Sequence, residues 1–593
     1  VAGWSTTSSV SYQPTPFALR TGANEFTTYD FAGNMVGTTQ GSFGVKSDFE
    51  LGAGWSVHEN VRYSKNKGRW DGPGQGSMPN DITDNVIPGF TNFAGLAGIT
   101  TYTDLRSGRS AQVQSLDGRS YSLLNYDLPH TEGSVQNAVM FQGANIQELR
   151  SEEYLAKLSV EKRTEHMQWT FGTYFNHAKA GYHVWGPFGA STFEPNPRML
   201  DIKHQLPDGT VLQITNPQGF SEGILRNTND MTWKQVSFFV SNNWQIARDW
   251  SFDAGVRHEN VDVDTANALF WTRKFVSDNP ATRYDNSYLE LLDPQIVDRS
   301  IGTTSWTAAL NHDFDERQSL YVRYSRGKKS PDYAFYQNIW DEATDRLSAT
   351  IPQDVTQVEL GYRFQAERYR IDVTPYYSLL SAPGQGTLFR PDPDGGPVPQ
   401  AYSAFTPANE TDNYGIEFDG EARFNYGFAV RAAVTVQRSH ILKNYQFAQP
   451  NGPGPVDDAV LVQVNRGNEA DLIADVMATI TPSYTRGPVR AQLQWQYIGD
   501  RQANAYNAWV MPGFDQANLD VTWHVNDALS ASFTVNNLTN SRGIMQWGPP
   551  GGFNGFVGRG IFTKEDVEAN PDAVFGGLAI PARAYFISAT YRL

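Results

Sequence analysis

The sequence predicts an all-β protein whose strands form a transmembrane antiparallel β-barrel. Aromatic residues make up 13% of the 593 residues, whereas the mean hydropathy is only −0.47. No apolar run approaches the ~18 residues that a spanning helix needs, so helical membrane proteins are excluded. Barrel strands alternate lipid-facing and lumen-facing side chains, so a barrel combines low average hydropathy with many aromatic residues.

Side chains alternate clearly along several segments. In 356–364, apolar residues occupy every second position, and in 415–424 the residues between them are almost all charged. A one-faced soluble sheet also alternates, but in a barrel the polar side faces the lumen. We therefore predict lumen-facing side chains, which contact a plug or ions or merely hydrate the lumen, at Arg363, Glu417, Asp419, Glu421, Arg423 and Arg490.

Short and long connections alternate along the chain, as the two rims of an outer-membrane barrel require. Tight turns are predicted near Thr164, Arg248, Glu316, Ala366, Tyr426, Gly487 and Asp527. Long connections are predicted at 67–151, 179–233, 265–300, 329–354, 381–410, 442–470, 501–516 and 541–582. Many strands between them span ten or more residues, which is the length that a tilted strand needs to cross a bilayer.

The composition gives little sign of catalysis. Cysteine is absent, the ten histidines are dispersed and no HExxH spacing occurs, so we predict no catalytic residue and no metal site. The net charge of −16 argues against nucleic-acid binding. No cofactor is expected. A solvated turn is favoured for RPDPDGG, although a calcium ion at Asp392 and Asp394 in an extracellular loop is the alternative.

The long connections carry large aromatic side chains. Such residues stack on sugar rings or aromatic chelators, but they also pack loops together or lie at the membrane interface. For any single residue loop packing is favoured, and for the group two or three are expected to contact a ligand. The candidates are Trp185, Trp271, Trp340, Tyr506, Trp509 and Trp547.

Six segments from residue 249 to the end carry recognisable strand motifs. They are DWSFDAGVRHENVDVD, SLYVRYSRGKKSPDYAFY, PQDVTQVELGYRF, NYGIEFDGEARF, FTVNNLTNSRG and PARAYFISATYRL. In this order they resemble barrel strands of TonB-dependent outer-membrane receptors. The sequence departs from the family at His258 and at the terminal Leu593, where aromatic residues are usual.

The resemblance implies a barrel of about 22 strands in the intact fold, with long extracellular loops and short periplasmic turns. Residues 1–593 would form this barrel in the bacterial outer membrane, in contact with its lipid. The family also has an N-terminal plug and a TonB box. Neither is found in this sequence, and we expect them to have been cleaved or to be supplied separately.

By resemblance, the barrel is a receptor for TonB-dependent, energy-coupled uptake of a scarce small molecule. Its partners would be TonB with the inner-membrane energising complex, and the solute would be a ferric chelate, a saccharide or an aromatic compound. The alternative is a surface platform that holds a partner lipoprotein or another protein over the barrel mouth. A third reading, a soluble multidomain β enzyme, would need paired carboxylates in a cleft.

Overall fold

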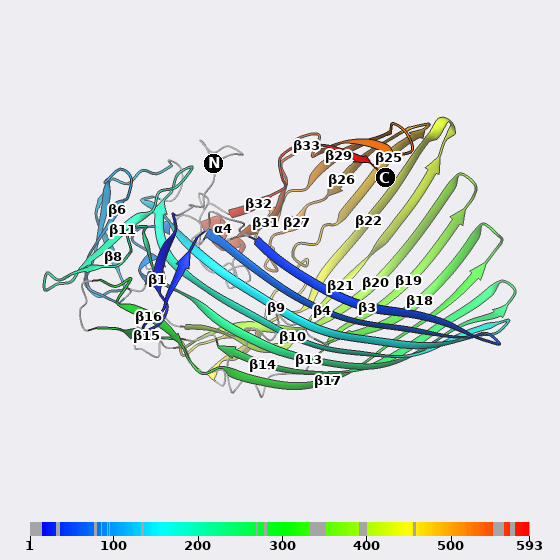
Figure 1. The fold of residues 1–593 in the computed structure, drawn as a ribbon, viewed down its shortest axis with the longest axis horizontal. Coiled ribbons are helices and arrows are strands. Elements are labelled where there is room, and N and C mark those ends of the chain that lie inside the picture. The colour runs from blue at the N-terminus through cyan, green and yellow to red at the C-terminus, as the bar shows by residue number, and fades with distance from the viewer. Residues whose placement is uncertain are drawn as a thin grey trace.

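One long, curved β-sheet dominates the computed structural model of the protein (Figure 1). The structure describes residues 15–30, 36–75, 80–84, 86–91, 93, 95–131, 136–268, 271–277, 282–330, 352–390, 400–454, 458–548, 563–569 and 576–591. No helix in these ranges is long and apolar enough to cross a membrane.

The sheet curves into a barrel that contains eighteen of the described strands. Antiparallel ladders join them in chain order from β3 to β33, and the short strand β5 extends the pairing of β9. The strands are β3 (Val36–Gly52), β4 (Trp55–Gln75), β5 (Asn80–Asp81), β9 (Ala138–Arg163), β10 (Met167–Thr192), β13 (Phe220–Ala247), β14 (Trp250–Ala268), β17 (Gln295–Asp313), β18 (Gln318–Lys329), β19 (Gln353–Gln365), β20 (Tyr369–Arg390), β21 (Gln400–Arg423), β22 (Phe428–Lys443), β25 (Val476–Arg486), β26 (Val489–Ile498), β29 (Phe514–His524), β30 (Leu529–Asn536) and β33 (Ala584–Tyr591).

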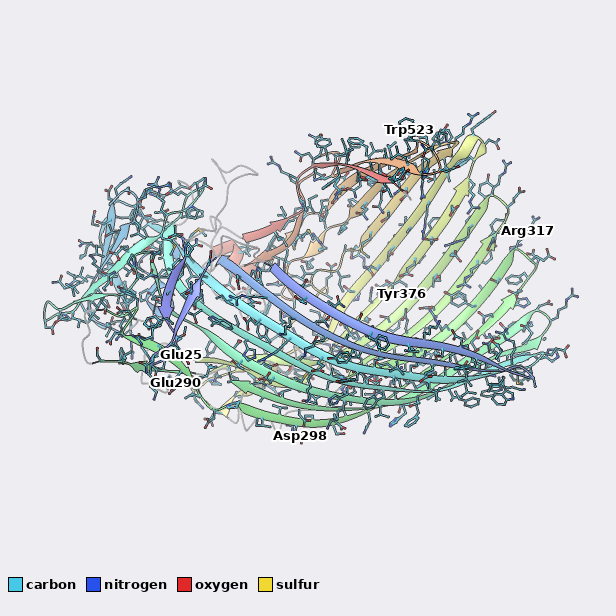
Figure 2. All side chains as sticks on the ribbon, viewed as in Figure 1. Glu25, Glu290, Asp298, Arg317, Tyr376 and Trp523 are labelled. Atoms are coloured by element: carbon cyan, nitrogen blue, oxygen red, sulfur yellow. The ribbon has the colours of Figure 1, made fainter. Side chains whose placement is uncertain are left out.

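All the predicted tight turns are confirmed, and they lie at one rim of the barrel. Arg317, in the turn between β17 and β18, marks this rim in Figure 2. The turn between β21 and β22 contains the 3-10 helix η1 (Asn425–Gly427), in which Tyr426 and Gly427 have positive φ angles. The long connections join the strands at the opposite, extracellular end.

Apolar side chains cover the outer face of the barrel. The register aligns Phe171 of β10 with Val160 of β9 on one side and Val240 of β13 on the other, and Val240 with Val256 of β14. Phe171 and Val256 are exposed, although they are large and apolar. Exposed apolar side chains on a continuous sheet face fit lipid rather than a second packed sheet, which confirms the barrel prediction over the soluble alternative.

Tryptophans mark the membrane boundary beside the tight turns. Aromatic girdles are typical of barrel interfaces because the rings combine apolar area with a polar group. The tryptophans beside the tight turns that share the outward face and are more than a third exposed are Trp55, Trp169, Trp244, Trp250 and Trp523.

Three of the predicted long connections, 67–151, 179–233 and 381–410, were predicted too long. The strands continue beyond the predicted boundaries, with β4 reaching Gln75 and β13 beginning at Phe220. Beyond the membrane the outer face need not be apolar, so the hydrophobic alternation fades while the backbone ladder continues. Sequence alternation therefore marked only the lipid-covered part of each strand.

The first two long connections together build a separate five-stranded sheet beyond the barrel. Its order is β12 (Val211–Gln213), β11 (Leu200–Gln205), β6 (Gly98–Asp104), β7 (Ser110–Ser115) and β8 (Tyr121–Tyr126). Its core includes Phe93, Tyr102 and Ile202, which are fully buried, and continues onto Phe141 and Phe188 of the barrel strands. The sheet is therefore packed against the barrel mouth (Figure 1).

The remaining described elements are short. They are two helices, α1 (Val86–Phe90) and α4 (Lys564–Ala569), and five two-stranded pairings: β1 (Phe17–Arg20) with β2 (Phe26–Tyr29), β15 (Trp271–Phe275) with β16 (Ser287–Leu291), β23 (Tyr445–Ala448) with β24 (Val460–Gln463), β27 (Arg501–Gln502) with β28 (Val510–Met511), and β31 (Ile544–Gly548) with β32 (Gly576–Ala579).

His204 is a buried histidine in the five-stranded sheet. Its Nε2 lies 3.1 Å from the carbonyl oxygen of Ala97 and its Nδ1 lies 2.9 Å from the Thr100 hydroxyl oxygen. Both contacts are satisfied by a neutral ring that donates from Nε2 and accepts at Nδ1. Burial lowers the pKa of His204 below its ordinary value of 6.5.

We expect acid to loosen this sheet through His204. Because the folded-state pKa is lowered, the stabilisation is complete above about pH 6.5 and is lost progressively as the pH falls below that value. Hydrogen exchange at β6 and β11 should become faster between pH 7.5 and pH 5.5, and His204→Gln should remove most of that difference. Equal pH dependence in the variant would contradict the role of His204.

The outward assignment predicts opposite effects at two adjacent residues of β13. Val240 faces lipid, whereas Ser241 pairs with Gly255 on the lumen side. Val240→Arg should lower the free energy of unfolding in lipid vesicles by about 2–4 kcal/mol, because a charge near the midplane must leave water. Ser241→Arg should change it by less than about 1 kcal/mol. Equal losses would show that the faces are assigned wrongly.

Candidate functional site

The predicted charged row lies on the lumen side of β19 to β22. Arg363, Asp419 and Arg423 alternate with outward residues such as Phe364 and Phe418. Figure 2 shows Tyr376 of β20 against the inner wall, where its hydroxyl donates to Gln437 Oε1 at 2.7 Å. Water in the lumen allows such a row to stay charged without a large desolvation cost.

Ion pairs join four neighbouring strands across this wall near the short-turn rim. Arg363 lies 3.3 Å from Asp372, which also accepts from Arg370 Nε at 3.0 Å. Arg370 donates in turn to Asp419 Oδ1, and Arg431 donates to Asp419 Oδ2 at 2.9 Å. Asp419 therefore links two arginines on opposite neighbouring strands.

The other predicted lumen residues are placed less closely together. Glu421 pairs with Arg423 on its own strand, at 2.6 Å. Glu417 is opposite Thr374 and Thr435, and no ion pair involving it occurs in the described part of the chain. Arg490 lies on β26, opposite Thr522 of β29. Which of these contact a plug stays a prediction.

A pocket of about 600 Å³ opens on the lumen side of the barrel at its extracellular end. Thr435, Gln496 and Gln516 project into it from barrel strands, and Met545 and Ile580 border it from the last long connection. Its lining combines hydrogen-bonding groups with apolar area, which is the usual composition of a small-molecule site.

Arg501 supplies the cation of this pocket. The residue is 9% exposed, and its guanidinium lies 5.5 Å from the ring centroid of Phe514. One terminal nitrogen donates to the carbonyl oxygen of Ile544 at 2.7 Å, but the buried Nε has no partner among the described groups. Burial lowers the pKa of Arg501, and no carboxylate in the described ranges pairs with it.

Three of the predicted aromatic residues lie together behind this pocket. The rings of Trp509 and Trp547 meet edge to face at 5.4 Å, and Trp547 is 3% exposed. The Tyr506 hydroxyl donates to Gln446 Oε1 at 2.8 Å. These contacts hold the loops that carry Arg501 and Met545. The three aromatic side chains do not line the pocket.

The remaining candidates lie elsewhere. Trp185 packs under the β1–β2 hairpin with Phe17 and Phe220. Trp271 begins β15, but its side chain is outside the described groups. Trp340 and the proposed calcium ligands Asp392 and Asp394 also lie outside the described residues. Among the described residues, no three His, Asp or Glu side chains are placed together to hold a metal.

The sequence interpretation missed Arg501. A signal existed, because Arg501 follows directly on a predicted barrel strand that ends in IGD, at the start of a long connection. Its burial, however, depends on Ile544, which is 43 residues away in another connection. No local pattern predicts that contact.

Comparison with known families accounts for this architecture. The family described as TonB dependent receptor-like, beta-barrel matches residues 2–538. The chain belongs to this family. The receptor is therefore an integral outer-membrane protein that interacts with TonB and with a transported substrate, and it is not an enzyme.

Solved structures share the receptor fold at low sequence identity. A copper transporter, OprC, is 11% identical with a TM-score of 0.51, and the match covers 95% of this chain and 79% of that one. The siderophore receptor PiuA from Acinetobacter baumannii is also 11% identical, with a TM-score of 0.50 and coverage of 98% and 82%. At this identity the likeness concerns the fold alone.

The ion pairs of the receptor's inner wall should contribute little to stability. Asp419 and its two arginines are partly exposed, and such pairs are worth at most about 1 kcal/mol. Asp419→Asn should lower the free energy of unfolding by that amount or less at low salt, and the difference should vanish at high salt. Glu417→Gln, which removes a carboxylate without a recorded ion pair, is the matched control. A large loss that persists in salt would contradict this view.

Proposed function

We propose that the receptor imports an anionic metal chelate, whose carboxylate or phenolate groups bind Arg501 in the lumenal pocket. The carrying observation is a buried arginine, 9% exposed, whose Nε has no hydrogen-bond partner and which has no carboxylate partner among the described residues. A buried cation without a counter-charge is costly, so an anionic ligand that pairs with it gains more than it would at the surface.

The rest of the pocket fits an organic scaffold around such a group. Gln496, Gln516 and Thr435 offer amide and hydroxyl groups, whereas Met477, Met545 and Ile580 offer apolar contact. The pocket volume of about 600 Å³ is in the range of small-molecule sites.

A ferric chelate is favoured over a saccharide. Neutral sugars bind chiefly by stacking on exposed aromatic faces and by hydrogen bonds, and they do not need a buried cation. Trp509 and Trp547 pack against each other, so these two rings support the loops instead of offering free faces. The buried cation therefore supports the ferric chelate as the proposed substrate class.

The surface-platform alternative has one supporting feature. The five-stranded sheet extends beyond the barrel, and its residue Leu116 is 85% exposed. A lipoprotein that covers the mouth would contact this sheet first. Gentle purification with identification of a stoichiometric partner, lost on Leu116→Ser, would favour this second function.

We expect Arg501→Gln to weaken binding of ferric complexes of carboxylate and catecholate chelators by at least about tenfold, because a desolvated charge pair is lost. Calorimetric titration of the purified receptor measures this effect, and iron uptake by cells reports the same loss.

Two variants control this experiment. Arg466→Gln removes an exposed cation from the neighbouring connection and should leave binding unchanged. Arg501→Lys keeps the charge and should retain part of the affinity. The proposal fails if Arg501→Gln binds these chelates normally, or if a neutral oligosaccharide binds the receptor and depends on Arg501 to the same degree.

A further inference from the structure

A second hollow lies on the outer face of the barrel, on the lipid side. It has a volume of about 730 Å³ and crosses β4, β9, β10, β13 and β14. Its cations are Lys65, Lys67, Arg150 and Lys179, which we call the basic patch. The register places Lys65 opposite Glu152, and Glu152 opposite Lys179, on the same face as the apolar residues Val61 and Leu158.

The basic patch lies directly above the apolar band, toward the extracellular end. Tyr63 and Tyr154 separate the two, with ring centroids 4.8 Å apart, and both hydroxyls donate to Glu152 at 2.9 and 3.2 Å. Lys65 is four residues beyond Val61 along a strand that rises about 3.3 Å per residue and is tilted by about 40°. Lys65 is therefore about 10 Å above Val61 along the barrel axis, on the extracellular side of the two tyrosines, and we place the patch at the level of lipid headgroups.

The cations of the patch lack close carboxylate partners. Within the described residues, no carboxylate lies within ion-pair distance of Lys65, Lys67, Arg150 or Lys179. Arg150 donates instead to His183 Nε2 at 2.5 Å. The hollow also contains Glu152, Asp230 and Asp264, so four cations face three carboxylates.

Four outward cations on the extracellular part of other barrel strands have ion-pair partners. Arg326 and Lys328 of β18 share Asp354, with Lys328 at 3.5 Å. Lys443 pairs with Glu410 at 2.9 Å, and Arg438 lies 3.5 Å from Glu469. Among the described outward cations on the extracellular part of the strands, those without an ion pair are therefore gathered on β4, β9 and β10, with Lys234 of β13 beside them.

Gly181 lies at the floor of the hollow. A Cβ at Gly181 would lie 2.8 Å from Asp230 Oδ1 and 3.0 Å from Arg150 Nε, so a larger residue would displace both side chains. Gly181 faces outward beside Arg150 in the ladder. The glycine thus lets the side chains of Arg150 and Asp230 lie close over the floor of the hollow.

We propose that the basic patch binds the phosphate-bearing headgroup of an outer-leaflet lipid, whose acyl chains lie on the apolar band below Tyr63 and Tyr154. Phosphate oxygens accept from lysine and arginine together, and each cation near an anionic membrane surface contributes to binding. Asp298, the register partner of Asp264, lies on the outside of the wall in Figure 2, which marks the edge of the patch.

The test uses the full chain in phosphatidylcholine nanodiscs doped with lipid A, and native mass spectrometry counts the retained lipid A. Replacing Lys65, Lys67, Arg150 and Lys179 with Gln should weaken lipid A binding by about tenfold or more. Dephosphorylated lipid A should bind the unchanged protein equally weakly.

The matched control replaces Arg326, Lys328, Arg438 and Lys443 with Gln, which removes the same formal charge from outward cations that have partners. This control should retain lipid A. The proposal is overturned if both quadruple variants lose lipid A alike, if neither does, or if inorganic phosphate alone displaces the lipid.

Should the patch variant fold poorly, the double variant Lys65→Gln with Lys67→Gln tests the same point and should show a smaller loss of lipid A. Ferric chelate binding at Arg501 is expected to stay unchanged throughout, so failure of one proposal leaves the other standing.

Discussion

Inside hydrocarbon every backbone N–H and C=O must find a partner within the protein, and the antiparallel ladders from β3 to β33 supply partners on both sides of the long strands that lie between these two. The ladder fixes a side-chain period of two, so each strand has one lipid face and one lumen face. Apolar residues such as Phe171 can then be exposed on one side while Asp419 is hydrated on the other. Every functional placement in this receptor follows from that alternation.

The inner wall shows why charge is tolerated there. Asp419 bridges arginines on both neighbouring strands, yet its side chain stays in contact with solvent. Arg501 differs, because two loops cover it at the mouth and leave one nitrogen unpartnered. An ion pair that water can reach contributes little binding free energy, whereas pairing a charge that is already buried contributes much more. The mouth and not the charged wall is therefore the stronger candidate for substrate binding.

Parity in the sequence was enough to predict that Arg363 and Glu421 lie on the polar face of their strands and that tight turns lie near Thr164 and Gly487, because these depend on local order. It could not predict that β4 continues to Gln75, since strand residues above the membrane no longer alternate. Nor could it predict the five-stranded sheet or the burial of Arg501, which join segments distant in the chain. Local patterns determine barrel strands, whereas loop structure depends on long-range contacts.

The two places where cations lack carboxylate partners differ in their exposure to water, and this difference bears on what each can bind. Lys65 and Lys67 are exposed, so salt largely screens their attraction for anions that are more than about 8 Å away at physiological ionic strength. Arg501 is covered by protein and is screened much less. A weak, exposed site is occupied when its ligand is present at high local concentration, as a membrane lipid is. A dilute solute needs the higher affinity that a buried cation can provide. The two proposals thus place the permanent neighbour on the outside of the barrel and the scarce cargo on the inside.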